Sequence, residues 1–138
     1  MQTITDNKSI ITCFNHEVIE NGNAEIFKKI MDKDFINHSA PDGTPNNGYG
    51  MWYFFDQILR PAFPDLKVTI HELVADDETV TTRKSIQATH TGNLMGIDPT
   101  NKTVVIDIID IIKIKNGKLS EHWAQNNFTD IIAQLTSN

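Results

Sequence analysis

Apolar residues recur at helical spacing through the first 62 positions of the chain, interrupted by short polar stretches. The spacing predicts an amphipathic helix over about residues 7–21 and a shorter helix that Asn23 caps and that ends near Asp32. A third helix, rich in aromatic residues, is expected over residues 51–62. Between the second and third helices, residues 34–38 alternate briefly, which predicts a short strand or an extended entry into a loop.

From residue 66 onward the apolar period changes from helical to alternating, as expected for strands. Strands are predicted over about residues 66–74 and 79–91, and two longer strands within the segment 104–128. Asn116-Gly117 separates the last two strands, and this dipeptide is typical of a two-residue hairpin because both turn residues need positive φ. A short helix over residues 128–135 is expected to follow.

Helices that precede strands, without alternation of the two, predict an α+β fold. We expect a mainly antiparallel sheet that curls over helices packed on one of its faces. A length of 138 residues is ordinary for one domain, which we expect to span residues 1–138.

The composition, with 39% hydrophobic and 22% charged residues, is typical of a globular protein. A formal net charge of −6 argues against a surface that binds nucleic-acid phosphates. No apolar run reaches the roughly 18 residues of a membrane span, and no secretory leader is recognisable. We therefore expect a cytoplasmic protein with neither nucleic-acid nor membrane partners.

One carboxylate interrupts the most apolar predicted strand. Asp110 shares a strand face with a row of aliphatic residues, Val104, Ile106, Ile108, Ile112 and Ile114. A buried carboxylate either finds a partner or takes up a proton, and a raised pKa would suit Asp110 for proton transfer near neutral pH. If His122 on the next strand faces the same interior, the hairpin carries an acid/base pair.

The plainer interpretation of these residues is structural. Asp110 would then lie at a strand rim or face a neighbouring lysine, and His122 would be a hydrogen-bonded core histidine. On the strand 79–91, Lys84 is the exception in an otherwise apolar row that ends with a second histidine, His90. Both interpretations stay open at this point.

Several motifs resemble those of the SnoaL-like polyketide cyclase or ester cyclase family, in the nuclear-transport-factor-2-like superfamily. The motifs are Phe35-Ile-Asn-His-Ser-Ala-Pro-Asp-Gly43, His90-Thr91-Gly92, Met95-Gly-Ile-Asp-Pro-Thr100, Asn116-Gly117-Lys118 and Glu121-His122-Trp123. The resemblance covers nearly the whole chain. It implies a cone-shaped α+β barrel of the cystatin-like type, in which helices and sheet enclose an apolar pocket.

The resemblance also implies a function. Cyclases of this family close a ring by aldol chemistry, in which an acidic side chain moves a proton α to a carbonyl. The family's general acid/base aspartate falls on Ala124 here, and a family histidine falls on Asp110. The family mechanism therefore does not transfer unchanged. A homodimer through the outer sheet face is implied, and no metal or organic cofactor.

Three functions are compatible with these residues. The first is a pocket enzyme of cyclase, isomerase or dehydratase type that acts on an apolar, carbonyl-bearing molecule; the second is a non-catalytic protein that binds a small hydrophobic ligand; the third is a structural or dimerising module. The candidate catalytic residues are Asp110, His122 and His90, and the candidate substrate contacts are Phe14, Phe35, Asn37, His38, Trp52 and Asn126. The five histidines do not stand at metal-ligand spacings, so no metal site is expected.

Overall fold

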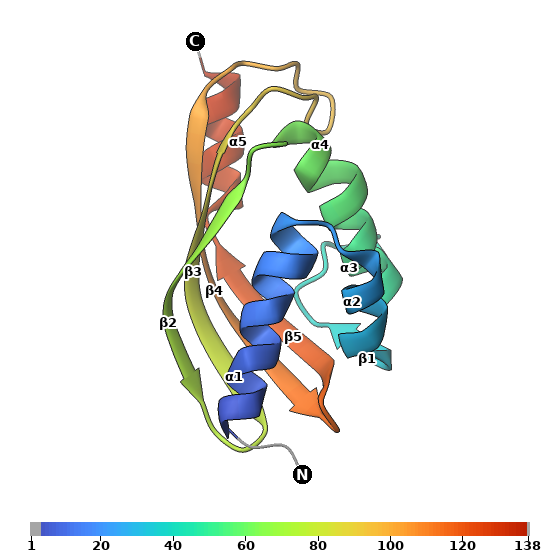
Figure 1. Cartoon of the computed structure of the whole chain (residues 1–138). Coiled ribbons are helices and arrows are strands. Elements are labelled where there is room, and N and C mark those ends of the chain that lie inside the picture. The colour runs from blue at the N-terminus through green and yellow to red at the C-terminus, as the bar shows by residue number, and fades with distance from the viewer. Residues whose placement is uncertain (1–3, 138) are drawn as a thin grey trace.

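The computed structural model describes residues 4–137, which form a curved sheet with a layer of helices on its concave side (Figure 1). The helical segments are α1 (Ile4–Cys13), η1 (Phe14–Glu20), α2 (Ala24–Ile30), α3 (Gly48–Tyr53), η2 (Phe54–Leu59), α4 (Arg60–Ala62) and α5 (Phe128–Thr136). The strands are β1 (Met31–Asn37), β2 (Lys67–Ala75), β3 (Thr79–Thr89), β4 (Thr103–Lys115) and β5 (Lys118–Asn126). This architecture confirms the predicted α+β class.

The five strands form one sheet in the order β1-β5-β4-β3-β2. Strands β2 to β5 are antiparallel neighbours, and β1 is added to the edge by parallel pairing with β5. The long hairpin of β4 and β5 therefore lies between β1 and β3. In Figure 1, α1 crosses the concave face of the sheet, while α5 packs beside the first residues of β4.

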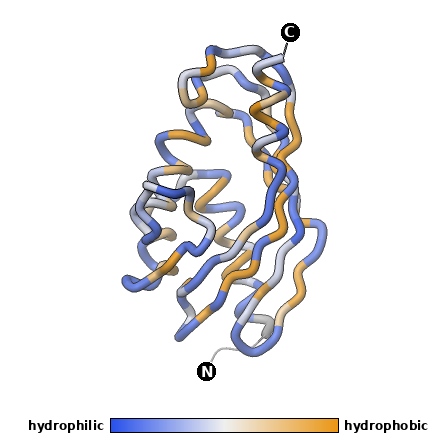
Figure 2. Tube along the Cα trace, turned by 180° about the vertical axis from the view of Figure 1, so that it is seen from behind, coloured by the Kyte–Doolittle hydropathy of each residue, from blue (hydrophilic) through white to orange (hydrophobic). Residues whose placement is uncertain are grey.

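The turn of the central hairpin has the geometry that its sequence predicts. Asn116 and Gly117 both have positive φ, 53° and 76°, between paired Lys115 and Lys118. The alternation of β4 also places side chains as expected: the row that contains Asp110 faces the core, and the intervening residues face outward. Figure 2 shows this mixture of hydrophobic and hydrophilic positions along the strands from behind.

Two segments differ from the sequence prediction. Met31, expected at the end of the second helix, is the first residue of β1, because the chain turns extended there with ψ of 125°. The first and third helices each change from α to π winding midway, at Phe14 and at Phe54. Wider π turns frequently occur at functional sites.

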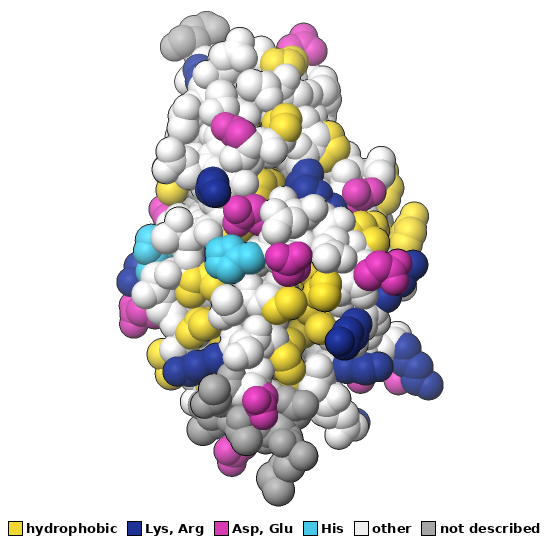
Figure 3. Space-filling model, viewed as in Figure 1, with side chains coloured by type: hydrophobic (Ala, Val, Ile, Leu, Met, Phe, Trp, Pro, Cys, Tyr) yellow, Lys and Arg dark blue, Asp and Glu magenta, His cyan; other side chains and the backbone are white. Residues whose placement is uncertain are grey.

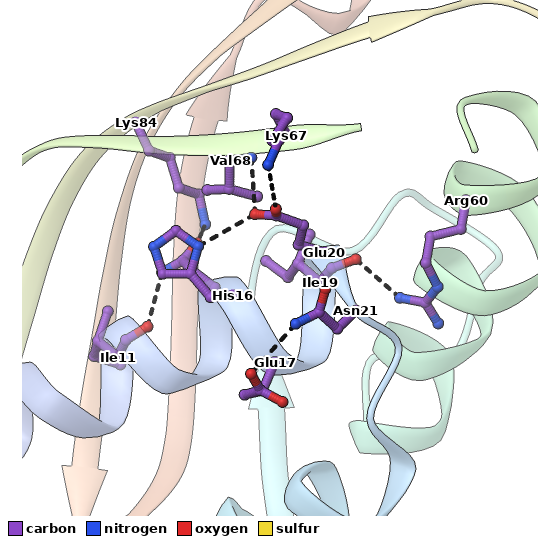
Figure 4. A network of polar contacts seen from close by, with 11 residues as sticks. Ile11, His16, Glu17, Ile19, Glu20, Asn21, Arg60, Lys67, Val68 and Lys84 are labelled. Atoms are coloured by element: carbon purple, nitrogen blue, oxygen red, sulfur yellow. Dashed lines mark hydrogen bonds and ion pairs between the residues drawn. The ribbon is translucent and has the colours of Figure 1, made fainter. Parts of the chain in front are cut away.

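The carbonyl groups near the end of η1 accept hydrogen bonds from Arg60 of α4. Nη1 of Arg60 donates to the carbonyl oxygens of Val18 and Ile19 at 2.8 and 3.0 Å. Glu20 accepts the backbone N–H of Val68, so η1 is also tied to β2 (Figure 4). These bonds fix η1 over the sheet.

Figure 3 shows basic and acidic side chains interspersed over the helical face rather than gathered by sign. Among residues 4–137, no helix combines the length and apolar character that crossing a membrane requires.

Candidate functional site

The buried carboxylate of Asp110 has a charged partner on the neighbouring strand. Its Oδ2 lies 3.1 Å from Nζ of Lys84, and the two side chains are 2% and 3% exposed. The antiparallel pairing of β3 with β4 sets both residues on the inner face of the sheet. Asp110 therefore has the lysine partner that the plainer interpretation of the sequence expected.

Lys84 is held by residues of the helix that crosses the sheet. Its ammonium donates to Oδ1 of Asn15 at 2.6 Å and lies 5.9 Å from the centre of the Phe14 ring. Figure 4 shows Lys84 extending from the sheet toward η1, which carries both residues. The amide of Asn15 is fixed in turn, because its Nδ2 donates to the carbonyl oxygen of Ile11.

The electrostatics of Asp110 differ from the sequence expectation. Burial raises the pKa of this carboxyl, but the charges and hydrogen bonds of Lys84 and His122 outweigh burial and lower its pKa below the ordinary value of 3.8. The expectation of a raised pKa was wrong because it took account of the apolar row and not of Lys84. Asp110 is an ionised counter-ion at neutral pH.

His122 is the second group at this carboxylate. Its Nε2 lies 3.6 Å from Oδ2 of Asp110, and its Nδ1 lies 2.8 Å from Oδ1 of Asn37. On β5, Ala124 pairs directly with Asp110, so His122 reaches the carboxylate diagonally. The side chain of His122 is 12% exposed, in contrast to the 2% of Asp110. His122 thus lies between the buried ion pair and the outside.

Two side-chain oxygen atoms beside Lys84 and His122 have no hydrogen-bond partner within the described residues. They are Oδ1 of Asp110 and Oγ1 of Thr82, both buried. Thr82 pairs with Asp110 across β3 and β4, so the two side chains are neighbours on the inner face. Buried oxygens of this kind call for a hydrogen-bond partner, such as a water molecule or a ligand group.

His90 does not join this group. It follows the end of β3, eight residues beyond Thr82, which corresponds to roughly 25 Å along a strand. Its Nδ1 accepts the backbone N–H of Thr100, and its ring lies 5.6 Å from that of Phe63. His90 therefore does not converge with Asp110 and His122 as expected. Asp110 pairs with Thr82, and each residue from Thr82 toward His90 increases the distance from Asp110.

The other predicted contacts divide between the site and the rest of the molecule. Asn37 contacts His122 and Phe14 contacts Lys84, as described, and Phe35 is buried in β1. Trp52 packs against Phe27 and Arg60 instead.

Two predicted contacts lie on the outer surface. His38 stacks on Trp123 at 4.7 Å and bonds Glu121 at 2.9 Å. Asn126 is exposed, and its Oδ1 accepts the backbone N–H of Phe128 at the start of α5. Asn126 therefore serves the helix terminus, and its contact with substrate stays a prediction.

Two surface hollows of the described residues are lined by residues other than Asp110, Lys84 and His122. One hollow follows the outer side of α1 and η1 and is lined by Lys8, Ser9, Thr12, Cys13, His16 and Glu17. A second lies over the neighbouring ends of β2, β3 and β4. The enclosed pocket around Asp110 stays a prediction. Within residues 4–137, no group of three or more His, Cys, Asp or Glu side chains is placed to hold a metal ion.

Lys84 and Asn15 were missed as site residues, although the sequence contained a signal for each. Lys84 interrupts the apolar row of β3, as Asp110 interrupts that of β4. Asn15 stands four residues from both Ile11 and Ile19 on the buried side of the first helix. The shared signal is thus a polar residue in an apolar row. When two such rows lie on adjacent strands, their charged residues are predicted to form an ion pair.

A curved sheet with helices over its concave face, and a polar cluster set into that face, defines a protein of the nuclear-transport-factor-2-like fold. The model of the SnoaL-like polyketide cyclase family matches residues 9–135, so the chain belongs to this family. No curated protein matches the chain.

Solved structures agree with this fold. TsrD from Streptomyces laurentii has a TM-score of 0.86 at 17% identity, with 100% of both chains covered. A protein of Acidithiobacillus ferrooxidans with a provisional polyketide cyclase assignment has a TM-score of 0.82 at 26% identity, covering 98% of this chain and 97% of that one. A SnoaL-like polyketide cyclase from Agrobacterium tumefaciens has a TM-score of 0.70 at 18% identity, covering 98% and 99%.

Proposed function

We propose that this protein is a small-molecule enzyme of the SnoaL-like type, in which His122 exchanges a proton with an apolar, carbonyl-bearing substrate and Asp110 stabilises the charged imidazole. The observation that carries the proposal is the arrangement of a partly exposed histidine against a buried, ionised carboxylate, with 3.6 Å between Nε2 and Oδ2. A histidine oriented by a carboxylate is a recurrent proton carrier in enzymes.

The proton moves in a balanced pair of steps. A C–H bond α to the carbonyl breaks, its electron pair moves to the carbonyl oxygen as an enolate, and the proton forms an N–H bond at Nε2 of His122. Return of that proton to a different carbon completes an isomerisation. In an aldol ring closure, the enolate carbon forms a C–C bond with a second carbonyl carbon of the substrate, the π electrons of that carbonyl move to its oxygen, and this oxygen takes the proton. In a loss of water, the enolate re-forms its carbonyl, the C–O bond at the β-carbon breaks, and the departing hydroxide takes the proton. Several of the structural neighbours are described as polyketide cyclases, which favours a polyketide-like substrate.

Lys84 does not take the proton in this scheme. Its ammonium is already engaged by Asp110 and Asn15 and faces the Phe14 ring. The ion pair with Lys84 keeps Asp110 charged, which is the state that stabilises a protonated histidine.

The alternative function is a non-catalytic protein that holds a small hydrophobic ligand. Ala124 favours it, because this position lacks the carboxylate that the family resemblance expects there, and the neighbouring Asp110 is already paired with Lys84. Both functions predict an apolar ligand, and they differ only in whether a proton is exchanged.

Hydrogen–deuterium exchange at the α-carbon of a probe ketone distinguishes the two. The protein is incubated in D₂O with apolar cyclic β-diketones and β-keto esters, and loss of the α-proton signal is followed by NMR. We expect exchange about 10²–10⁴-fold faster with the wild type than with His122→Gln. His71→Gln, at an exposed histidine of β2, is the matched control and retains the rate. Binding of a probe without exchange would support the ligand-binding alternative.

A further inference from the structure

Asn37 and His122 are paired neighbours where β1 adds to β5. Nδ1 of His122 lies 2.8 Å from Oδ1 of Asn37, and the same oxygen accepts the backbone N–H of Ser39 at 3.0 Å. Because a backbone N–H only donates, the Asn37 atom at this point is the amide oxygen and not the amide nitrogen. The proton shared with His122 therefore belongs to Nδ1 of the histidine.

This hydrogen bond decides which ring nitrogen of His122 is free. With a proton on Nδ1, the neutral imidazole keeps its lone pair on Nε2, the atom that lies 3.6 Å from Asp110. The opposite tautomer would direct the lone pair of Nδ1 at the oxygen of Asn37 over 2.8 Å. A proton that arrives at Nε2 finds an acceptor in Oδ2 of Asp110.

Among the charged groups around His122, Asp110 favours a proton on Nε2, because its ionised carboxylate lies 3.6 Å from that atom, whereas the shorter hydrogen bond of 2.8 Å to Asn37 favours a proton on Nδ1. On the inner side, Lys84 faces Asp110 and not the imidazole hydrogen bond with Asn37. The adjacent Glu121 is engaged with His38 at 2.9 Å and lies 3.8 Å from Lys113. Asn37 is therefore the polar group that contacts Nδ1.

We infer that Asn37 is a positioning residue, which holds His122 in the Nδ1–H tautomer and thereby makes Nε2 the atom that accepts the substrate proton. This role replaces the expected direct contact of Asn37 with substrate. Its catalytic meaning rests on the proposed function, but the tautomer itself is measurable without any substrate.

The test is the protonation of the ring nitrogens of His122 in the full chain, observed by NMR with ¹⁵N-labelled histidine. The spectrum is recorded at a pH at which the imidazole is neutral, and His122→Gln identifies the signals by their loss. We expect a protonated Nδ1 and an unprotonated Nε2 in the wild type. A proton on Nε2 of the neutral wild-type ring would overturn the inference.

Two substitutions of Asn37 sharpen the test. Asn37→Ala removes the acceptor, so the proton is expected to move to Nε2, where Asp110 accepts it. Asn37→Asp retains an acceptor and is expected to keep the proton on Nδ1. Gln125→Ala, at an exposed position of the same strand as His122, is the matched control and leaves the tautomer unchanged. An unaltered tautomer in Asn37→Ala would also overturn the inference.

The inference and the proposed function fail in different ways. Absence of α-proton exchange together with a protonated Nδ1 overturns the proposed function and supports the hydrogen bond that Asn37 makes. Exchange that depends on His122, together with a protonated Nε2 in the resting protein, overturns the role of Asn37 alone.

Discussion

Asp110 and Lys84 neutralise each other in the interior of the molecule, where their side chains are 2% and 3% exposed. Removing one partner leaves the other as an uncompensated buried charge, whereas removing both leaves none. The stability of the core therefore depends on the two residues as a unit, and a change at Asp110 affects folding as well as any proton transfer.

Single and double substitutions measure this dependence. We expect Asp110→Leu to lower the free energy of unfolding by about 3–5 kcal/mol, because Lys84 is left unpaired. The double variant Asp110→Leu/Lys84→Met is expected to recover most of that loss, since apolar residues of similar size replace the pair. Denaturant unfolding measures both values. The single variant Lys84→Met completes the comparison. If the double variant loses as much free energy of unfolding as Asp110→Leu and Lys84→Met lose together, the two residues do not act as a pair.

The lowered pKa of Asp110 also predicts how stability depends on pH. A carboxyl whose pKa is lower in the folded than in the unfolded state binds fewer protons when folded, so its contribution is present above its ordinary value of 3.8 and is lost as the pH falls through the folded value. We expect the free energy of unfolding to fall with acidification below about pH 4.

Comparison of variants separates Asp110 from the other acids in that pH range. Asp65 and Asp76 also have lowered pKa values, through hydrogen bonds from Thr89 and Thr79, but both acids are almost fully exposed and are present in every variant. Asp110→Asn should therefore lose part of the acid dependence and keep the rest. An identical pH profile for the wild type and Asp110→Asn would show that Asp110 is not stabilised in its ionised form.

At the scale of elements, the sequence predicted those features that local patterns determine. The period of apolar residues gave the helices and strands, and Asn116-Gly117 gave the central hairpin and its register. The pairing of β1 with β5 was not predictable in this way, because parallel pairing of distant segments leaves no local turn signal. The expectation that His90 would join Asp110 was wrong for another reason: His90 lies beyond the end of β3, eight residues from Thr82, which is the residue that pairs with Asp110.

The loop between β3 and β4 is anchored by a close approach that only glycine permits. Thr91 and Gly92 both donate their backbone N–H groups to the carbonyl oxygen of Ala62, at 3.2 and 3.1 Å. A Cβ atom on Gly92 would overlap the carbonyl oxygen of Pro61. The loop therefore rests directly on the end of α4.

Substitution of this glycine tests the anchor. We expect Gly92→Ala to lower the free energy of unfolding by about 1–3 kcal/mol, because loop and helix must separate to admit the methyl group. Gly48→Ala is the control: its Cβ would meet the flexible side chain of Met31 at 3.0 Å, and alanine favours the helix, so stability should be unchanged or increased. Equal thermal unfolding of Gly92→Ala and the wild type would contradict the anchor.

At the scale of the whole molecule, the outer face of the sheet carries large apolar side chains in solvent. Val105, Ile109, Ile111 and Trp123 are 44, 52, 40 and 38% exposed. Ile111 and Trp123 are direct partners in the pairing of β4 with β5, and Ile109 is the next outward residue to Ile111, so these three side chains form one patch. Asp107 separates Val105 from Ile109 along β4. We propose that a second copy of the chain covers this patch in a homodimer, because a two-fold interface matches a patch with itself.

A charge placed in the patch tests the homodimer. Ile109→Glu is expected to convert a dimer into a monomer, since the carboxylate would be buried without a partner in the interface. Light scattering coupled to size-exclusion chromatography measures the mass of each species. Tyr49→Glu, at an exposed position of the helical layer, is the control and retains the dimer. A monomeric wild type at micromolar concentration would refute the proposal.

The pairing of β1 with β5 has a consequence for the order of events during synthesis. Asn37 and His122 are 85 positions apart, so the histidine leaves the ribosome long after its partner. Until residues 118–126 have emerged, β1 has no strand beside it in the sheet, because its pairing is with β5 alone. Contacts of such long range form slowly, since a long loop must close before they stabilise the fold. A nascent chain that ends before β5 therefore lacks His122 and a completed sheet edge, so the contacts of His122 with Asp110 and Asn37 can form only once the last strand is in place.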